Sequence, residues 1–290
     1  MDSKFSISRT WRIACIDFYK WIINSRMIVV AAMIVFVWSF AVTPLMEISR
    51  EMNSPLNFIE PFIAVLNSRV LCLVTPAVYI FLISDYPRLD RNSLFVLHRV
   101  NKAEWVLGQF IFFALSAFAF TAIIFIASLI PNCMNSFIAN GWSLVVTKYG
   151  VYNPERAYSF AASLIKEELY NQIAPYQAAV TSFFLDFLYM LTLAMILLLF
   201  HVLNLRKIGV PVSISVIAVG SALGILGSSG MWYFPMAHTM IHLHFTKHLK
   251  EPIMELKASF IYFGILILVL LLLSLIRVKH TNFLNIDDNE

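Results

Sequence analysis

The amino-acid sequence predicts an all-α, multi-pass membrane protein with six transmembrane helices. Of its 290 residues, 60% are hydrophobic and only 13% are charged, which is far more apolar than a soluble domain. Several apolar runs reach about 18 residues, the length that an α-helix needs to cross a bilayer. Charged residues gather in segments between these runs, because a charged side chain at the hydrocarbon centre costs at least ~2.5–3.5 kcal/mol. These three observations define the fold class.

Residues 1–26 are expected to form an interfacial helix on the cytoplasmic side. Aromatic residues such as Trp11 and Trp21 are interspersed with basic residues such as Arg12 and Lys20. This mixture is typical of a helix that lies in the membrane surface, with its basic side toward anionic headgroups. The alternative interpretation is a cytoplasmic extension of the first span.

Residues 27–280 are predicted to form the transmembrane domain, and residues 281–290 an acidic cytoplasmic tail. Span five is rich in Gly, Ser and Ala and is expected to pack closely against its neighbours. Between spans three and four, residues 154–173 have helical character, and an outer helical segment is expected before span six. The predicted spans are residues 27–46, 66–84, 106–130, 179–203, 208–226 and 258–276.

The start of span two is open, because Arg69 interrupts the apolar pattern. Span two is either a short helix from Val70, or a longer helix from about Phe58 with Arg69 near the outer interface. In the second case, Arg69 either pairs with Glu60 or extends its charged end toward the headgroups.

Basic residues predict the orientation of the chain. Most of the 21 Lys and Arg residues lie in the short segments 1–26, 84–109, 204–207 and 277–290. Short loops rich in Lys and Arg remain in the cytoplasm. We therefore expect both termini in the cytoplasm and the protein in the cytoplasmic membrane. The same rule accounts for the net charge of +4, so we expect no nucleic-acid partner.

The segment Ser84–Gln109 is a charged island between two apolar runs. Its middle, residues 92–105, is predicted to form a short amphipathic helix with leucines on one face and basic residues off it. Such a helix, held between two spans, is suited to receive force from a soluble partner. The candidate residues for this contact are Asp85, Arg88, Asp90, Arg91, Leu94, Leu97, Arg99 and Lys102.

Two ionisable residues are candidates for a substrate pathway. Asp186 is the only acidic residue well inside a predicted span, and intramembrane ionisable residues are usually functional. It either lines an outer vestibule or binds water near a helix start. Arg69 is the second candidate.

Four histidines precede span six. The pairs His238/His242 and His244/His248 each have i, i+4 spacing, which places two imidazoles on one helix face and could hold a metal ion. A six-residue offset rotates the pairs by roughly 240° on an ideal helix, so one helix cannot bring all four together. An amphipathic interfacial helix is therefore the preferred interpretation, and the histidines are weak metal candidates.

No chemistry of its own is predicted for this chain. It has no G-x-x-x-x-G-K-[ST] sequence, so we expect any ATP to be bound elsewhere. Its three cysteines, Cys15, Cys72 and Cys133, are too scattered for a disulfide framework or a redox motif. We expect no catalytic residue and no cofactor.

The layout resembles the membrane subunits, or permeases, of ABC-2-type exporters. Segments 3–25, 85–105 and 231–255 match, in order, that family's interfacial N-terminal helix, its cytoplasmic coupling helix between spans two and three, and its outer element before span six. The sequences Arg99-Val-Asn-Lys102 and Trp105-Val-Leu-Gly-Gln109 are similar to the family's start of span three. The sequence Asp85-Tyr-Pro-Arg88 is less typical of it.

This resemblance implies export of a peptide, lipid or drug-like substrate, driven by a separate ABC ATPase subunit. It also implies a second permease subunit, identical or homologous, surrounded by membrane lipids. The charged island would then provide the residues that couple to the ATPase. Two alternatives remain open: a membrane-embedded, metal-dependent enzyme at the outer face that uses the histidines, and a non-transporting sensor or scaffold subunit.

Overall fold

The computed structural model describes residues 5–87, 100–134, 136–246 and 252–280. In this part of the chain, five helices are long and apolar enough to cross a membrane, and a sixth span results if one bent helix pair is counted. The chain is therefore an all-helical, multi-span membrane protein. The five long helices are Ser25–Glu51, Lys102–Asn132, Pro175–Val202, Arg206–Leu226 and Leu256–His280.

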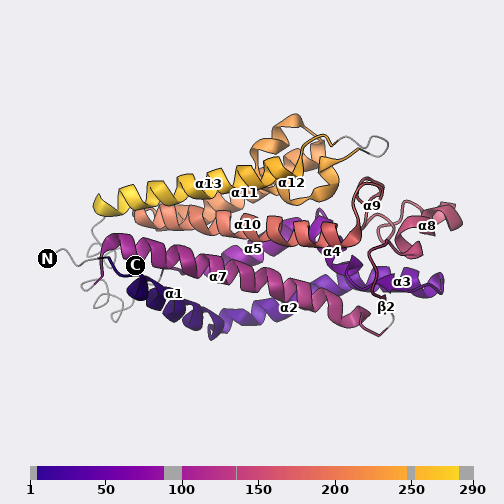
Figure 1. Ribbon diagram of the computed structural model, residues 1–290, viewed down its shortest axis with the longest axis horizontal. Coiled ribbons are helices and arrows are strands. Elements are labelled where there is room, and N and C mark those ends of the chain that lie inside the picture. Colours follow the sequence, from indigo (N-terminus) through magenta and orange to yellow (C-terminus); the bar gives the residue numbers. More distant parts are fainter. Residues whose placement is uncertain (1–4, 88–99, 135, 247–251, 281–290) are drawn as a thin grey trace.

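These helices run side by side along the long axis of the molecule (Figure 1). We call one end the basic end: it holds α1 (Ile7–Ile22), the start of α7 (Lys102–Leu129) and the end of α13 (Leu256–Arg277). The opposite end, called the loop end, holds α3 (Thr43–Glu51), α8 (Leu144–Tyr152) and α9 (Glu167–Tyr170). The charged segments of the sequence thus lie mainly at the two ends of the bundle.

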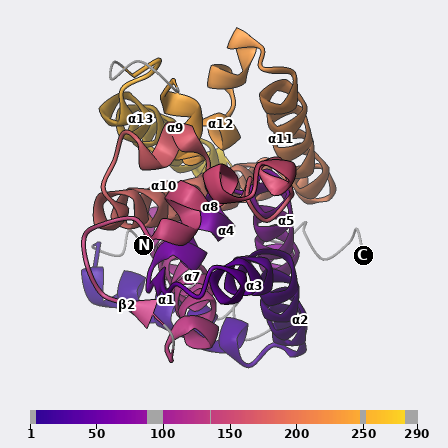
Figure 2. The same ribbon diagram turned by 90° about the vertical axis from the view of Figure 1, so that its right-hand side faces the viewer.

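Helix α10 (Pro175–Val202) is the centre of the bundle. It packs against α7, α11 (Arg206–Leu226) and α13, and against the bent pair. Viewed along the bundle, it lies between α13 and α7 (Figure 2). Because α10 is apolar on every side, it can be buried by neighbours all round.

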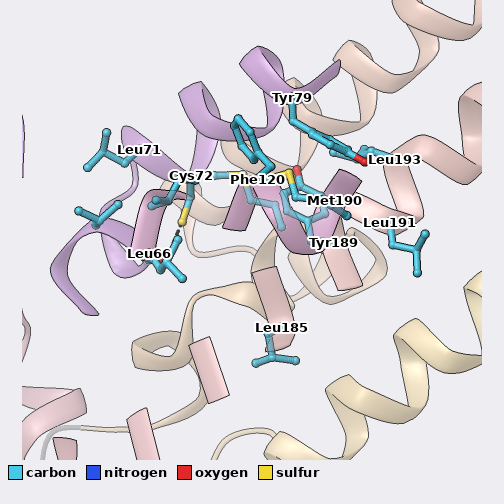
Figure 3. Close-up of a cluster of buried hydrophobic side chains, with 14 of the residues drawn as sticks. Leu66, Leu71, Cys72, Tyr79, Phe120, Leu185, Tyr189, Met190, Leu191 and Leu193 are labelled. Carbon is cyan, nitrogen blue, oxygen red and sulfur yellow. Dashed lines mark hydrogen bonds between the residues drawn. The ribbon is translucent and has the colours of Figure 1, made fainter. Parts of the chain in front are cut away.

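The middle of the core joins three helices (Figure 3). Tyr79 of α5 (Leu71–Ile83), Phe120 of α7 and Tyr189 of α10 are all almost completely buried. The Tyr79 and Phe120 rings lie 5.3 Å apart, centre to centre. Close packing of large side chains gives the bundle interior its stability in a bilayer, where apolar lipid tails compete for the same surfaces.

Span two is broken rather than straight. Helix α4 (Glu60–Asn67) meets α5 at an angle of 81°, so one continuous helix over residues 66–84, or from about Phe58, was the wrong expectation. The alternative, a short helix from Val70, agrees with α5, which begins at Leu71. The Asn67 amide donates to Ile63 O at 3.0 Å and to Ser182 Oγ at 3.2 Å, and its oxygen accepts from Ile241 N at 2.9 Å. A break in a membrane helix needs such partners, because exposed backbone groups are costly in lipid.

Glu60 is bonded to backbone groups of the loop end. The Glu60 carboxylate accepts from the backbone N–H of Asn57 at 3.0 Å and of Ser143 at 2.6 Å. Arg69 is exposed at the break between α4 and α5. Glu60 therefore fixes the loop end instead of pairing with Arg69.

The first long helix changes its winding in the middle. It consists of a 3₁₀ turn (Ser25–Met27), α2 (Ile28–Val37), a π-helical turn (Trp38–Val42) and α3. Pro44 follows the π turn, and proline removes a helix hydrogen bond and clashes with the preceding turn. The wider π turn accommodates that clash, and Trp38 Nε1 donates to Ala127 O at 2.7 Å, which fixes the turn to α7.

Apart from the ends of the long helices, the elements at the loop end are short. Strand β1 (Leu56–Asn57) pairs in parallel with β2 (Ser136–Phe137). The helix expected over residues 154–173 is reduced to a 3₁₀ turn (Pro154–Arg156) and to α9, so that prediction was wrong. Before α13 lie three short helical pieces: Ser229–Tyr233, α12 (Pro235–Thr239) and Ile241–His244. Met240 has an extended backbone, so the histidines do not share one helix.

Candidate functional site: a polar junction at the basic end

Glu104 joins α1 to the start of α7. Its carboxylate accepts from the backbone N–H of Ser6, from Arg9 Nη2 at 2.8 Å and from the backbone N–H of Asn101 at 3.1 Å. Asn101 in turn caps α7 by accepting from Ala103 N. This is a reciprocal capping box. Glu104 is completely buried, so its charge is balanced by Arg9 and by two backbone donors.

Helix α1 crosses α7 obliquely. Residue 6 meets residue 104, whereas residue 17 meets residue 109, through the Gln109 Nε2 to Asp17 Oδ2 bond of 2.7 Å. Gly108 allows this approach: a Cβ there would lie 2.9 Å from Ile13 Cγ2 and 3.1 Å from Thr10 O. The opposite face of α1 exposes apolar side chains, including Ile7, Trp11 and Ile16. A location in the membrane surface remains a prediction for this helix.

Asp85 joins three further elements. Its carboxylate lies 2.8 Å from Arg26 Nη2, at the start of the first long helix. Its backbone carbonyl accepts from Arg206 Nη2 at 3.1 Å, at the start of α11. Arg26 also donates to Ser84 Oγ at 2.8 Å and stacks over the Phe81 ring at the end of α5.

Lys102 connects α7 to the last long helix. Its Nζ donates to Lys279 O at 3.1 Å. We call the set Arg9, Arg26, Asp85, Lys102, Glu104 and Arg206 the junction. Through the junction, the two described ends of the charged island contact α1 and the basic ends of four long helices.

The other residues predicted in the island lie outside the described residues. These are Arg88, Asp90, Arg91, Leu94, Leu97 and Arg99. Their role in contacting a partner therefore stays a prediction. The predicted amphipathic helix over residues 92–105 is not one continuous helix, because Asn101 has an extended backbone and α7 begins at Lys102; its part before residue 100 lies outside the described residues.

Asp186 and Arg69 are placed in different surroundings. Asp186 is buried and accepts from Thr121 Oγ1 of α7 at 3.0 Å. It lies well inside α10, and its burial shows that it faces the interior of the bundle. Arg69 is exposed and acts electrostatically on His242. A role in a substrate pathway remains a prediction for both.

The histidines divide between two sites, and His248 lies outside the described residues. His238 and His244 both contact Ser259 of α13, whereas His242 Nε2 lies 3.1 Å from Lys166 Nζ. Burial lowers the pKa of His242 well below its ordinary value, and Lys166 and Arg69 lower it further. Within the described ranges, no group of three or more His, Cys, Asp or Glu residues is arranged to hold a metal ion.

Sequence reasoning missed most of the junction. The spacing Asn101-x-x-Glu104 is a capping-box signal that could have been found in the sequence. Nothing local indicates that Arg9 meets Glu104 or that Arg206 meets Asp85, because each pair is about a hundred residues apart or more. Gly108 was noted only as part of a family-like sequence, and its role in admitting α1 required the structure.

No protein-family model, no curated protein and no solved structure matches this chain. The length and hydropathy of its helices define it as a multi-pass membrane protein.

Proposed function

We propose that this chain is the membrane-spanning permease subunit of an ABC-2-type exporter. A separate ATPase subunit would bind and hydrolyse ATP, and a second permease subunit, identical or homologous, would complete the complex. The substrate would be a peptide, a lipid or a drug-like molecule, carried across the cytoplasmic membrane. Both termini and the charged island would lie in the cytoplasm.

The observation that carries this proposal is the junction. A permease must convert a push on its cytoplasmic surface into movement of its spans. Asp85 and Lys102 belong to the two described ends of the island, and between them they contact the start of the first long helix, the start of α11 and the end of α13. Glu104 adds α1. A force applied between residues 85 and 102 would therefore reach most of the bundle.

The bonds of the junction are suited to transmitting such a force. The Arg9–Glu104 contact joins a completely buried carboxylate to a partly covered guanidinium, and charge-assisted hydrogen bonds are shorter and stronger than neutral ones. Arg26 and Arg206 approach Asp85 from two different helices. Movement of Asp85 would thus shift both helices together.

The substrate pathway would lie among the first, second and fifth spans. Helix α5 packs against both α2 and α11, and Asp85 at its end is bonded to both of these spans. Displacement of this end of α5 would therefore change the spacing between α2 and α11. In this account the 81° break gives α5 freedom to move separately from α4.

Two variants and a control test the coupling. The double variant Leu97→Ser/Arg99→Ala should lose association with the ATPase, measured by co-purification from the membrane. Asp85→Ala should keep that association, and it should lower ATP hydrolysis and transport at least several-fold, because it removes the ion pair between Arg26 and the segment that follows α5. Lys148→Ala, an exposed residue of α8 at the loop end, should change neither.

Normal association and normal ATP-driven transport in both the Leu97→Ser/Arg99→Ala and Asp85→Ala variants would contradict the coupling role. Association without any transport in the wild-type chain would instead favour a sensor or scaffold subunit.

A further inference from the structure

Two buried histidines converge on one serine. His238 Nδ1 lies 2.8 Å from Ser259 Oγ, and His244 Nε2 lies 2.8 Å from the same oxygen. The remaining ring nitrogens face backbone carbonyls: His238 Nε2 is 2.9 Å from Trp232 O, and His244 Nδ1 is 3.2 Å from Met240 O. All three side chains are almost completely buried. The four contacts form one continuous chain from carbonyl to carbonyl.

This chain lacks one hydrogen when both rings are neutral. A carbonyl only accepts, so each ring nitrogen that faces one must carry hydrogen. A neutral imidazole has a single N–H, so both nitrogens that face Ser259 are then acceptors. The serine hydroxyl has one hydrogen and can donate to only one of them. In the other contact, a nitrogen lone pair faces the serine oxygen and no hydrogen bond forms. If that ring takes its other tautomer, it can donate to Ser259, but its second nitrogen then has no hydrogen for the carbonyl that it faces.

One added proton completes the chain. The protonated ring donates to its carbonyl and to Ser259, and Ser259 donates to the other ring. A second proton would place two positive rings on either side of one oxygen and leave the serine hydrogen without an acceptor in the cluster. We propose that His238, Ser259 and His244 form a binding site for a single proton, which ties the segment Ser229–His244 to α13.

The surroundings of the cluster favour a delocalised positive charge. The Tyr262 ring stacks on His238 with centres 4.1 Å apart, and the Trp232 ring contacts His238 at 5.4 Å and His244 at 5.0 Å. Aromatic rings attract cations. In the part of the chain that the structure describes, no carboxylate forms an ion pair with either histidine.

Other titratable groups lie on the elements packed around the cluster. They are Asp186 and Tyr189 of α10, Cys72 of α5, Tyr233 next to the cluster, His242 with Lys166 and Arg69, Glu167 of α9, and Glu255 and Lys257 at the start of α13. None of these carboxylates shifts the pKa of His238 or His244.

The site is expected to fill only in acid. Burial lowers the pKa of His244 to about 4 and also lowers the pKa of His238, whereas the carbonyls that face the rings act in the opposite direction. Both rings are therefore neutral near pH 7, and the shared proton enters below the ordinary histidine value of about 6.5. The loop-end segment would then be fastened to α13 in an acidic medium and less firmly held in a neutral one.

Nitrogen NMR of the full-length chain tests this proposal. The chain, labelled with ¹⁵N-histidine, is placed in lipid nanodiscs and titrated from pH 8 to pH 3, with each ring assigned by a His→Gln variant. The expected result is that His238 and His244 change together and take up one proton between them. Uptake of two protons, unrelated midpoints for the two rings, or no change down to pH 3 would overturn the proposal.

Ser259→Ala supplies the second measurement. Without the bridging oxygen, the two rings should titrate independently, with midpoints about one pH unit lower, because a hydrogen bond to a charged ring stabilises that ring. Ser274→Ala is the matched control, since Ser274 is a buried serine of the same helix that donates only to Leu270 O of its own helix, at 2.8 Å. It should leave the coupled titration unchanged. If Ser259→Ala does not fold, the wild-type titration decides alone.

Hydrogen exchange measures whether the bound proton holds the segment Ser229–His244 more firmly to α13. After correction for the intrinsic effect of pH on exchange, amide exchange in residues 236–244 should slow several-fold as the wild-type site fills. Equal exchange rates in the empty and filled states would show that the proton does not fasten the segment. None of these measurements depends on transport or on an ATPase partner, so their outcome is separate from that of the proposed function.

Discussion

At the scale of single residues, the basic end depends on Glu104, a buried charge whose carboxylate accepts several hydrogen bonds. Glu104 is completely buried, but three donors from two elements surround its carboxylate. A buried carboxylate is tolerated only when it is paired and hydrogen-bonded. One glutamate therefore both caps α7 and holds α1 against it.

Glu104→Gln should destabilise the protein by about 1–3 kcal/mol, because the charge pair with Arg9 is lost and fewer donors are satisfied. A lower melting temperature in detergent would show it. Glu255→Gln is the matched control: Glu255 precedes α13 but makes no side-chain cap, and it is exposed. Equal melting temperatures for the two variants would contradict the role given to Glu104.

His242 predicts a pH dependence of stability. Its pKa in the fold is well below the ordinary value, since burial and the positive Lys166 and Arg69 oppose protonation. The unfolded chain takes up the proton near pH 6.5, so stability is full above that pH and falls as the pH decreases. The loss at pH 5.5 should be about 1 kcal/mol.

Melting temperatures measured at pH 7.5 and pH 5.5 check this prediction. His242→Gln should reduce the difference between them, whereas His280→Gln, an exposed histidine at the basic end, should not. If the melting temperature of His242→Gln fell as much between pH 7.5 and pH 5.5 as that of the wild type, His242 would not be the source of the pH dependence.

At the scale of elements, the broken span shows what local sequence can and cannot predict. Arg69 marked the interruption, because an arginine does not fit the middle of an apolar run. The angle of 81° was not predictable, since Asn67 is bonded to Ser182 and Ile241 from distant parts of the chain. The histidine segment gave a similar result: its i, i+4 spacing suggested one helix, but the extended backbone at Met240 divides it.

Asn67→Ala should cost about 1–3 kcal/mol, because the Ile241 N–H would lose its buried acceptor. The measurement is the melting temperature in detergent, with Asn171→Ala in an exposed position after α9 as control. A shift no larger than that of the control would mean that the break does not need Asn67.

At the scale of the whole molecule, the apolar runs predicted the long helices, because length and hydropathy are local properties. The junction was not predicted, because each of its bonds joins residues that are far apart in the sequence. The island was recognised from its charges, and two of its eight candidate residues, Asp85 and Lys102, lie within the described structure and belong to the junction. The other six remain predictions.

The orientation of the bundle can be measured with single cysteines. In a chain whose exposed native Cys15 and Cys133 are replaced, Lys148→Cys should react with a membrane-impermeant thiol reagent added outside intact cells. His280→Cys should react only after the membrane is opened, because basic segments remain in the cytoplasm. The reverse pattern would invert the proposed topology.

Gentle purification shows whether this chain works with a separate ATPase. The tagged full-length protein is extracted from its native membrane in mild detergent, and all co-eluting proteins are identified by mass spectrometry. We expect a stoichiometric companion that carries the G-x-x-x-x-G-K-[ST] sequence absent from this chain, and loss of that companion in the Leu97→Ser/Arg99→Ala variant. Elution of the chain alone from an active membrane would mean that it does not work with a separate ATPase.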